Sequence, residues 1–146
     1  MHIHVLAVGK IKERGLRDLI DDYAKRIGRY GSYHELELKD APHDELDEKF
    51  KKAIPARSRV YALEVEGRAV TSHELAQLVG RAEDTSVMNL VFLIGGAYGL
   101  PPITSRAADA QLSLSKLILP HRLARLLLVE QIYRAFTILR NEPYSH

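Results

Sequence analysis

Strand-like and helix-like patterns alternate along the whole chain, and this alternation limits the folds open to it. Segment 87–94 is almost continuously apolar, as expected of a central parallel strand that is covered on both faces. Segments 3–8 and 60–65 also have the pattern of strands, and each precedes apolar residues at helical spacing. The pattern predicts an α/β fold, with a parallel sheet and helices on both of its faces.

The remaining elements fit the same scheme. Segment 34–38 alternates apolar and charged residues, which indicates a strand exposed on one face near a sheet edge. Thr71 and Glu74 have the spacing of a capping box, and Gly67 is expected to turn the chain after the third strand. A further strand is expected near Leu112. Helices are expected at about 16–30, 44–54, from 71 onward, 103–109 and 121–140.

Length and composition indicate one globular domain over residues 1–146. The chain is 46% apolar and 27% charged, and no run of 18 apolar residues predicts a membrane span. Its N-terminus lacks the layout of a secretory signal, and cysteine is absent, which excludes disulfides and cysteine nucleophiles. We therefore expect a cytoplasmic protein. A net charge of +2 permits nucleic-acid binding without arguing for it.

Two loops at strand ends are the best candidates for a binding site. Leu112 and Leu114 alternate with serines, and Pro120 then precedes an apolar helix, so 112–121 could cradle a flat, mostly uncharged ligand. The second loop, 95–101, contains Gly95 and Gly96, which allow close approach to the backbone. It matches neither a Walker A motif nor Gly-x-Gly-x-x-Gly, and a tight turn without a ligand is the alternative.

The last predicted helix is apolar on nearly every side. Such a helix needs cover from more than one direction, and in a chain of this size a second subunit is expected to supply part of it. Glu130 and Arg134 lie four residues apart on this helix, either as a structural ion pair or as charged groups at a cleft. The apolar residues are Leu123, Ala124, Leu126, Leu127, Leu128, Val129, Ile132, Tyr133, Phe136, Ile138 and Leu139.

Two weaker patterns also carry candidate sites. His2 and His4 lie on one side of a strand, but no further ligand follows at metal spacing, so we expect no metal site. Basic residues gather after the first strand and along the last helix, where they could meet phosphates or form an ordinary solvated face. These are Lys10, Lys12, Arg14, Arg17, Arg122, Arg125, Arg134 and Arg140.

Taken together, these motifs resemble those of the ribosomal RNA large subunit methyltransferase H family, which belongs to the SPOUT class. The resemblance covers essentially the whole chain in order. It is carried by segments 5–10, 63–67, 92–99, 112–116, 119–121, 130–136 and 143–144.

The resemblance implies a SPOUT-type parallel sheet with a deep C-terminal trefoil knot, a homodimer and the cofactor S-adenosylmethionine. Where the family usually has threonine in the cofactor loop, this chain has Ile118. The cofactor-binding positions implied are Leu63, Gly95, Gly96, Leu114, Ser115, Lys116, Leu117, Ile118 and Leu119.

The implied reaction is methylation of N3 of a pseudouridine in 23S ribosomal RNA, on the assembled ribosome. A guanidinium beside the ring would stabilise the anion left when the N3 proton departs, and we assign this role to Arg134, oriented by Glu130. His121 and Tyr144 would position the base or relay its proton. The family tail is usually Tyr-His followed by a basic residue, whereas this chain ends Tyr144-Ser145-His146.

Three other functions are compatible with parts of the sequence. A related enzyme could methylate tRNA, and a catalytically silent module could bind ribosomes with the same fold. Retention of Glu130, Arg134 and both loops weighs against the silent module. A flavodoxin-like nucleotide-binding domain would share the alternation of elements, but the first strand is followed by no phosphate-binding loop.

Overall fold

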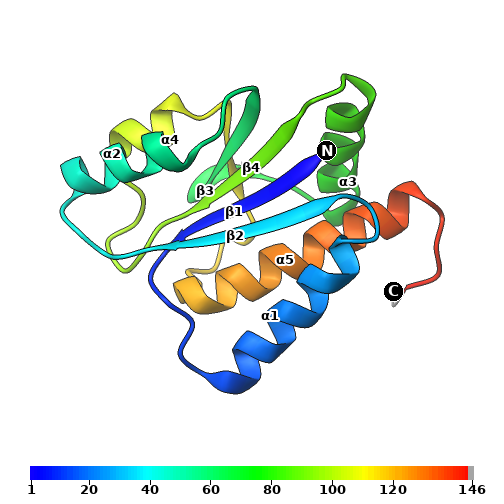
Figure 1. The fold of residues 1–146 in the computed structure, drawn as a ribbon, viewed down its shortest axis with the longest axis horizontal. Coiled ribbons are helices and arrows are strands. Elements are labelled where there is room, and N and C mark those ends of the chain that lie inside the picture. The colour runs from blue at the N-terminus through cyan, green and yellow to red at the C-terminus, as the bar shows by residue number, and fades with distance from the viewer. Residues whose placement is uncertain (145–146) are drawn as a thin grey trace.

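A computed structural model describes residues 1–144, which form a five-stranded parallel sheet with the order β2-β1-β4-β3-β5 (Figure 1). The strands are β1 (His2–Val8), β2 (Ser32–Leu38), β3 (Ser58–Ala69), β4 (Asn89–Ile94) and β5 (Ala110–Ser113). The helices are α1 (Arg14–Ile27), α2 (His43–Ala53), α3 (Ser72–Asp84), α4 (Pro102–Ala107) and α5 (His121–Leu139).

The central and edge strands lie where their patterns predict. β4 pairs with β1 on one side and β3 on the other, and every one of its residues is buried. The apolar run 87–94 therefore marks the centre of the sheet, although the strand itself begins at Asn89. β2 lies at an edge, and much of its length alternates between exposed and partly buried residues. Both expectations are confirmed.

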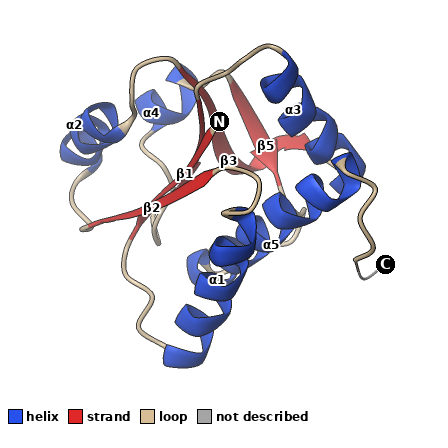
Figure 2. Ribbon diagram, turned by 45° about the vertical axis from the view of Figure 1, so that its right-hand side comes forward, coloured by secondary structure: helices blue, strands red, loops and turns tan. Residues whose placement is uncertain are grey.

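Helices cover both faces of the sheet, as the alternation predicts (Figure 2). Side chains of successive strand residues point to opposite faces. Ile3 and Val5 of β1 belong to the core cluster that includes α1, α3 and α5. Leu6 and Val8 belong to the other cluster, which includes Phe50 of α2. The α/β fold with two helical layers is thus confirmed.

β3 is longer than predicted and contains a bulge. It pairs with β5 through Leu63 and again through Arg68, and both residues face Leu112, so residues 64–67 bulge from the ladder. The prediction that Gly67 turns the chain after a strand ending near Val65 is wrong. A Cβ at Gly67 would lie 2.8 Å from the carbonyl carbon of Gln111, so glycine is needed where the bulge passes the β5 backbone.

The predicted capping box at the start of α3 is present. The Thr71 hydroxyl accepts a hydrogen bond from the Glu74 amide at 3.0 Å, and the Glu74 carboxylate accepts one from the Thr71 amide at 3.0 Å. These bonds satisfy amide groups that the first turn of a helix leaves without partners.

Most of the cover that α5 needs comes from the chain itself. The helix packs against α1 and α3, side by side with them in Figure 1. Leu123 and Leu127 nonetheless remain 43% and 38% exposed on its outer side. No helix within residues 1–144 is both long and apolar enough to span a membrane.

The connection from β5 to α5 crosses the carboxyl end of the sheet. β5 is the edge strand, whereas α5 begins near the end of β1, where Arg125 Nη2 donates to the Gly9 carbonyl at 2.9 Å. Segment 114–120 therefore returns from one edge toward the middle of the sheet. The trefoil knot that the resemblance implies stays a prediction.

Candidate active site

A cavity of about 530 Å³ lies at the carboxyl end of the sheet. Its walls are the end of β3 with its bulge, the loop after β4, and the connection from β5 to the start of α5. Ligand sites in parallel α/β sheets commonly form at this end. The cavity volume lies within the range of roughly 300–1,000 Å³ that is usual for small-molecule sites. The two loops that the sequence singles out are therefore walls of one cavity.

The glycine loop is both a tight turn and a wall of this cavity. Gly99 has φ +76°, and its amide donates to the Gly96 carbonyl at 3.0 Å. A Cβ at Gly95 would overlap the carbonyl carbon of Gly99, so this close backbone approach requires glycine. Gly95 and Gly96 both line the cavity. The loop is therefore a tight turn that also lines the cavity, and its role in ligand binding stays a prediction.

Two serines shape the connection between β5 and α5. The Ser113 hydroxyl donates to the Ser115 carbonyl, and the Ser115 hydroxyl accepts from the Leu117 amide, each at 2.9 Å. These bonds hold the loop in a bend over the cavity. Of the predicted cofactor positions, Lys116 does not line the cavity. Those that do are Leu63, Gly95, Gly96, Leu114, Ser115, Leu117, Ile118 and Leu119.

The lining is mostly apolar and carries little charge. Among its described residues, Glu64 and His121 are the only ionisable side chains, and neither lysine nor arginine is present. Glu64 lies on the β3 bulge and was not predicted as a site residue. The only feature of the sequence that could have indicated Glu64 is its position directly after Leu63, a predicted cofactor residue. The bulge that carries Glu64 depends on pairing with β5 and leaves no pattern in the local sequence.

His121 is the one predicted catalytic residue in the cavity wall. It is the first residue of α5, and a Cβ built on Gly9 would lie 3.7 Å from its Nε2. The imidazole therefore lies against the backbone at the end of β1. Gly9 has φ +96°, a conformation that favours glycine at this close approach.

Arg125 anchors the start of α5 from inside the protein. Its side chain is 1% exposed, and Nη1 donates to Glu35 at 3.0 Å and also to Glu37. Nη2 donates to the Gly9 carbonyl. Neither a phosphate contact nor a solvated face, the two interpretations open from the sequence, describes this residue. Its partners lie about ninety positions away, beyond the reach of local patterns.

Arg17 completes this charged network. Its guanidinium donates to Glu35 at 2.7 Å and to Asp21 at 2.8 Å. Burial raises the pKa of Glu35, but hydrogen bonds and charge from Arg17 outweigh it, so the pKa lies below its ordinary value. Arg17 and Arg125 thus keep the Glu35 carboxylate ionised beneath the start of α5.

Glu130, Arg134 and Tyr144 form a second cluster. Arg134 donates from Nε at 2.9 Å and from Nη2 at 2.6 Å to one Glu130 oxygen, and its Cζ lies 4.7 Å from the centre of the Tyr144 ring. The Tyr144 hydroxyl lies 3.3 Å from the same Glu130 oxygen. The hydrogen bond to Glu130 raises the pKa of Arg134, so the guanidinium stays charged. Three of the four predicted catalytic residues therefore meet.

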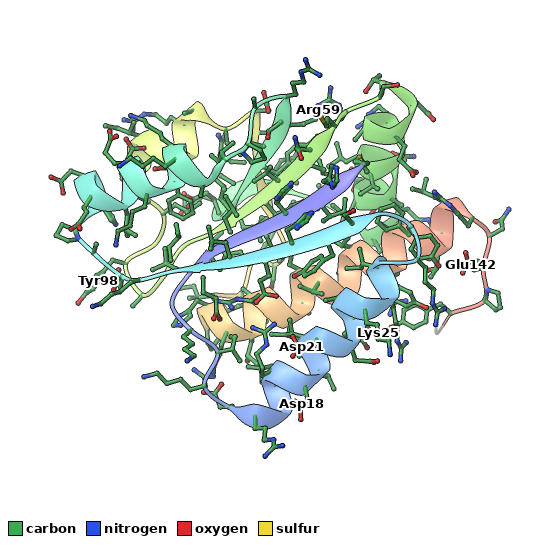
Figure 3. The ribbon with its side chains drawn as sticks, viewed as in Figure 1. Asp18, Asp21, Lys25, Arg59, Tyr98 and Glu142 are labelled. Carbon is green, nitrogen blue, oxygen red and sulfur yellow. The ribbon has the colours of Figure 1, made fainter. Side chains whose placement is uncertain are left out.

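This cluster and the cavity occupy different ends of α5. Arg134 follows His121 by thirteen residues, which corresponds to about 20 Å along a helix axis. Figure 3 shows Tyr98 of the glycine loop and Glu142 of the tail at opposite ends of the molecule. One chain therefore does not bring Arg134 to its own cavity. The expected role of the tail pair Ser145-His146 falls outside the described residues.

The N-terminal histidines form a cluster with a third one at the other end of the sheet. His4 stacks on His34 with ring centres 4.8 Å apart, and its Nε2 lies 2.9 Å from Asn89 Oδ1. Burial, as the largest cause, lowers the pKa of His4. Within residues 1–144, no three or more histidine, cysteine or acidic side chains are grouped so that they could hold a metal ion.

The parallel sheet and the loop-walled cavity at its carboxyl end agree with the comparison of the whole sequence with known families. A family model described as "Predicted SPOUT methyltransferase" matches residues 1–146. The chain belongs to the SPOUT methyltransferase family.

Its relatives are more specific, and they confirm the resemblance found in the sequence. The chain is 47% identical over 146 residues to Ribosomal RNA large subunit methyltransferase H of Sorangium cellulosum, covering 100% of both chains. It is 40% identical over 153 residues to the protein of that name from Geobacter sulfurreducens, again covering 100% of both.

A solved structure supports the fold. The structure of a probable methylase family protein from Haemophilus influenzae Rd KW20 matches with a TM-score of 0.60 at 14% identity, covering 99% of this chain and 70% of that one. At this identity the likeness concerns the fold alone.

Proposed function

We propose that this methyltransferase transfers a methyl group from S-adenosylmethionine to N3 of a pseudouridine in 23S ribosomal RNA, on the assembled ribosome. The loop-walled cavity carries the proposal, together with full-length relatives that are named as methyltransferases of large-subunit ribosomal RNA. A ribosomal substrate also agrees with the cytoplasmic location expected from the sequence.

The chemistry of the cavity fits this cofactor. S-adenosylmethionine combines a flat adenine with a cationic sulfonium and has no phosphate. The lining supplies apolar side chains and glycine backbone, with an acid but no lysine or arginine among its described residues. The absence of basic groups there argues against a nucleotide diphosphate and so against a flavodoxin-like function. Leu63, the glycine loop and segment 114–119 would hold the cofactor.

The side chains would then align the base and manage its proton. When bound, the cofactor supplies a methyl group that the sulfonium already activates, so alignment is the main task of the protein. The N3 proton must leave as the N–C bond forms, and Arg134 would stabilise the resulting ring anion. Glu130 fixes the orientation of Arg134. His121 and Tyr144 would position the base or relay its proton.

A homodimer would bring the cluster of Glu130, Arg134 and Tyr144 in one subunit to the cavity of the other. Leu123 and Leu127 are exposed on α5, and Glu130 and Arg134 continue their stripe at helical spacing. If two copies of α5 packed antiparallel about a two-fold axis near Leu127, Arg134 of the partner subunit would lie opposite His121. An isologous contact does this twice, so both cavities would be completed.

Transfer of labelled methyl groups tests the proposed substrate. Purified protein and labelled S-adenosylmethionine are incubated in parallel with ribosomes, free ribosomal RNA and tRNA, and products are located by mass spectrometry. Label at a pseudouridine of 23S RNA, only in assembled ribosomes, is the expected result. Label on tRNA would favour the alternative substrate. Cofactor binding without label on any RNA would favour a silent ribosome-binding module.

A further inference from the structure

Glu64 differs from the other acidic residues of the protein. It is partly buried on the β3 bulge, yet within residues 1–144 its side chain has no hydrogen bond or ion pair. The other partly or fully buried acids of this part of the chain all have polar partners. These are Glu35, Glu37, Asp47, Glu83 and Glu130.

The surroundings of Glu64 offer it no cation. Glu64 is one of the residues that line the cavity, where the other described lining residues are apolar, glycine or uncharged polar, apart from His121. A carboxylate that is partly withdrawn from water is disfavoured unless a charge or hydrogen-bond donor compensates for it. No described protein group supplies either one, so a cation bound in this cavity would find an uncompensated carboxylate in its wall.

The bulge places Glu64 in this position. Gly67 lets the bulge approach the backbone of Gln111 closely, and Leu63 on one side and Arg68 on the other both face Leu112 of β5. Because the ladder is interrupted here, Glu64 and Val65 of the bulge line the cavity together with Leu63. Glu64 is therefore held by the fold and is not a side chain on a free loop.

We propose that the Glu64 carboxylate recognises the positive charge of the methyl donor and so favours the donor over the spent product. The proposal rests on the proposed function, because it takes S-adenosylmethionine as the ligand. Transfer breaks the S–CH₃ bond and leaves its electron pair on sulfur, so the sulfonium becomes a neutral thioether. A carboxylate in the wall binds the charged form more strongly and releases S-adenosylhomocysteine more readily.

A different role for Glu64 has a different signature. If the carboxylate accepted hydrogen bonds from the ribose hydroxyls, it would treat donor and product alike, because both carry the same ribose. The ratio of the two affinities therefore reports charge recognition, whereas a uniform loss reports a neutral contact or a structural role.

The test is isothermal titration calorimetry of the full chain with S-adenosylmethionine, S-adenosylhomocysteine and sinefungin, which has an amine in place of the sulfonium. Glu64→Gln keeps the shape of the side chain and removes its charge. It is expected to weaken S-adenosylmethionine and sinefungin by about tenfold, while S-adenosylhomocysteine changes less than about twofold. Glu66→Gln is the matched control, since Glu66 lies on the same bulge, exposed and outside the cavity lining.

Three outcomes separate the proposals. Selective loss of the two cationic ligands in Glu64→Gln supports charge recognition. An equal loss of all three ligands, in a variant whose circular dichroism spectrum and unfolding midpoint match the wild type, overturns it. If the wild type binds none of the three, the proposed cofactor itself is wrong, and the role of Glu64 is overturned with it.

Discussion

At the scale of single residues, Arg134 combines a fixed orientation with a permanent charge, because Glu130 holds its guanidinium through two donors. Replacing it by alanine is expected to lower kcat by about 10²–10³-fold, the usual effect of removing one group that stabilises a developing anion. Methyl transfer to ribosomes gives kcat, and calorimetry gives the affinity for S-adenosylmethionine. The affinity is expected to stay unchanged, and full activity would remove Arg134 from the mechanism.

Arg125 is expected to matter for stability instead. Arg125→Met would leave Glu35 and Glu37 with less compensation below α5 and should lower the free energy of unfolding by about 3–5 kcal/mol. Urea unfolding followed by circular dichroism measures this loss. Arg122→Met, at an exposed position on the same turn, should change stability by less than about 0.5 kcal/mol. Equal effects of the two variants would show that the network is not stabilising.

The same network predicts a loss of stability in acid. The folded pKa of Glu35 lies below its ordinary value of 4.5, so its contribution is present above that value and lost as pH falls through the folded pKa. Unfolding free energies measured from about pH 7 to about pH 3 should show this loss. Arg17→Met should move it to higher pH, because Arg17 is the main group that lowers this pKa. An unchanged pH profile in that variant would contradict the assignment.

At this scale, contacts are predictable from the sequence where residues share an element or follow it closely. Glu130 and Arg134 are one helical turn apart, and Tyr144 follows the same helix, so their meeting was predictable. Arg125 finds its partners on a strand about ninety residues earlier, and Glu64 is placed by a bulge. Neither the contacts of Arg125 nor the position of Glu64 has a signature in the local sequence.

At the scale of elements, the β3 bulge links backbone packing to the cavity. Gly67→Ala would bring a Cβ to 2.8 Å from a backbone carbon of Gln111, and a backbone neighbour cannot move aside cheaply. We expect a loss of about 1–3 kcal/mol of stability and weaker binding of S-adenosylmethionine, because the bulge carries a cavity wall. Thermal unfolding and calorimetry measure the two effects.

Gly15→Ala is the control for this change. Nothing lies within 4 Å of a Cβ built at Gly15, and the residue lies in α1, where alanine is the better helix former. It should leave the unfolding midpoint equal or higher and cofactor affinity unchanged. If both glycine variants behaved alike, the close approach of Gly67 to the Gln111 backbone would not be what positions the β3 bulge in the cavity wall.

Elements were predictable where periodicity and turn chemistry agree. The buried run before Gly95 and the Thr71–Glu74 box both gave the correct element in the correct place. The extension of β3 to Ala69 was not predictable, because it depends on renewed pairing with β5, a strand some forty residues further along the chain. Strand pairing of this kind is set by the sheet and not by the segment itself.

At the scale of the whole molecule, the distance between the cavity and Arg134 predicts that active sites are shared between subunits. Ala97→Trp, at an exposed position in the cavity wall, should block the cofactor, and Arg134→Ala should remove the anion-stabilising group. Each homodimer alone should be inactive. Mixed dimers have one intact cavity facing one intact Arg134, so an equal mixture should regain about one quarter of wild-type activity.

Co-expression with two different affinity tags, followed by methyl-transfer assays on tagged pools, makes this measurement. Activity confined to the doubly tagged pool is the expected outcome. If that pool is as inactive as the parents, each site is contained in one chain, and α5 does not pair as proposed. The sequence predicted a second subunit from the apolar character of α5, but not which residues it would exchange, because that depends on spacing along a folded surface.

The buried contacts of Arg125 also have a consequence for the order in which the protein is made. Translation proceeds from the N-terminus, so Glu35 and Glu37 are synthesised about ninety residues before Arg125. Arg17 precedes both, and its bond to Glu35 in the folded protein needs no residue beyond Glu35, so this pair can form before Arg125 is made. When α5 is finally made, Arg125 therefore adds a second cation to a carboxylate, that of Glu35, which Arg17 of α1 is able to pair with first.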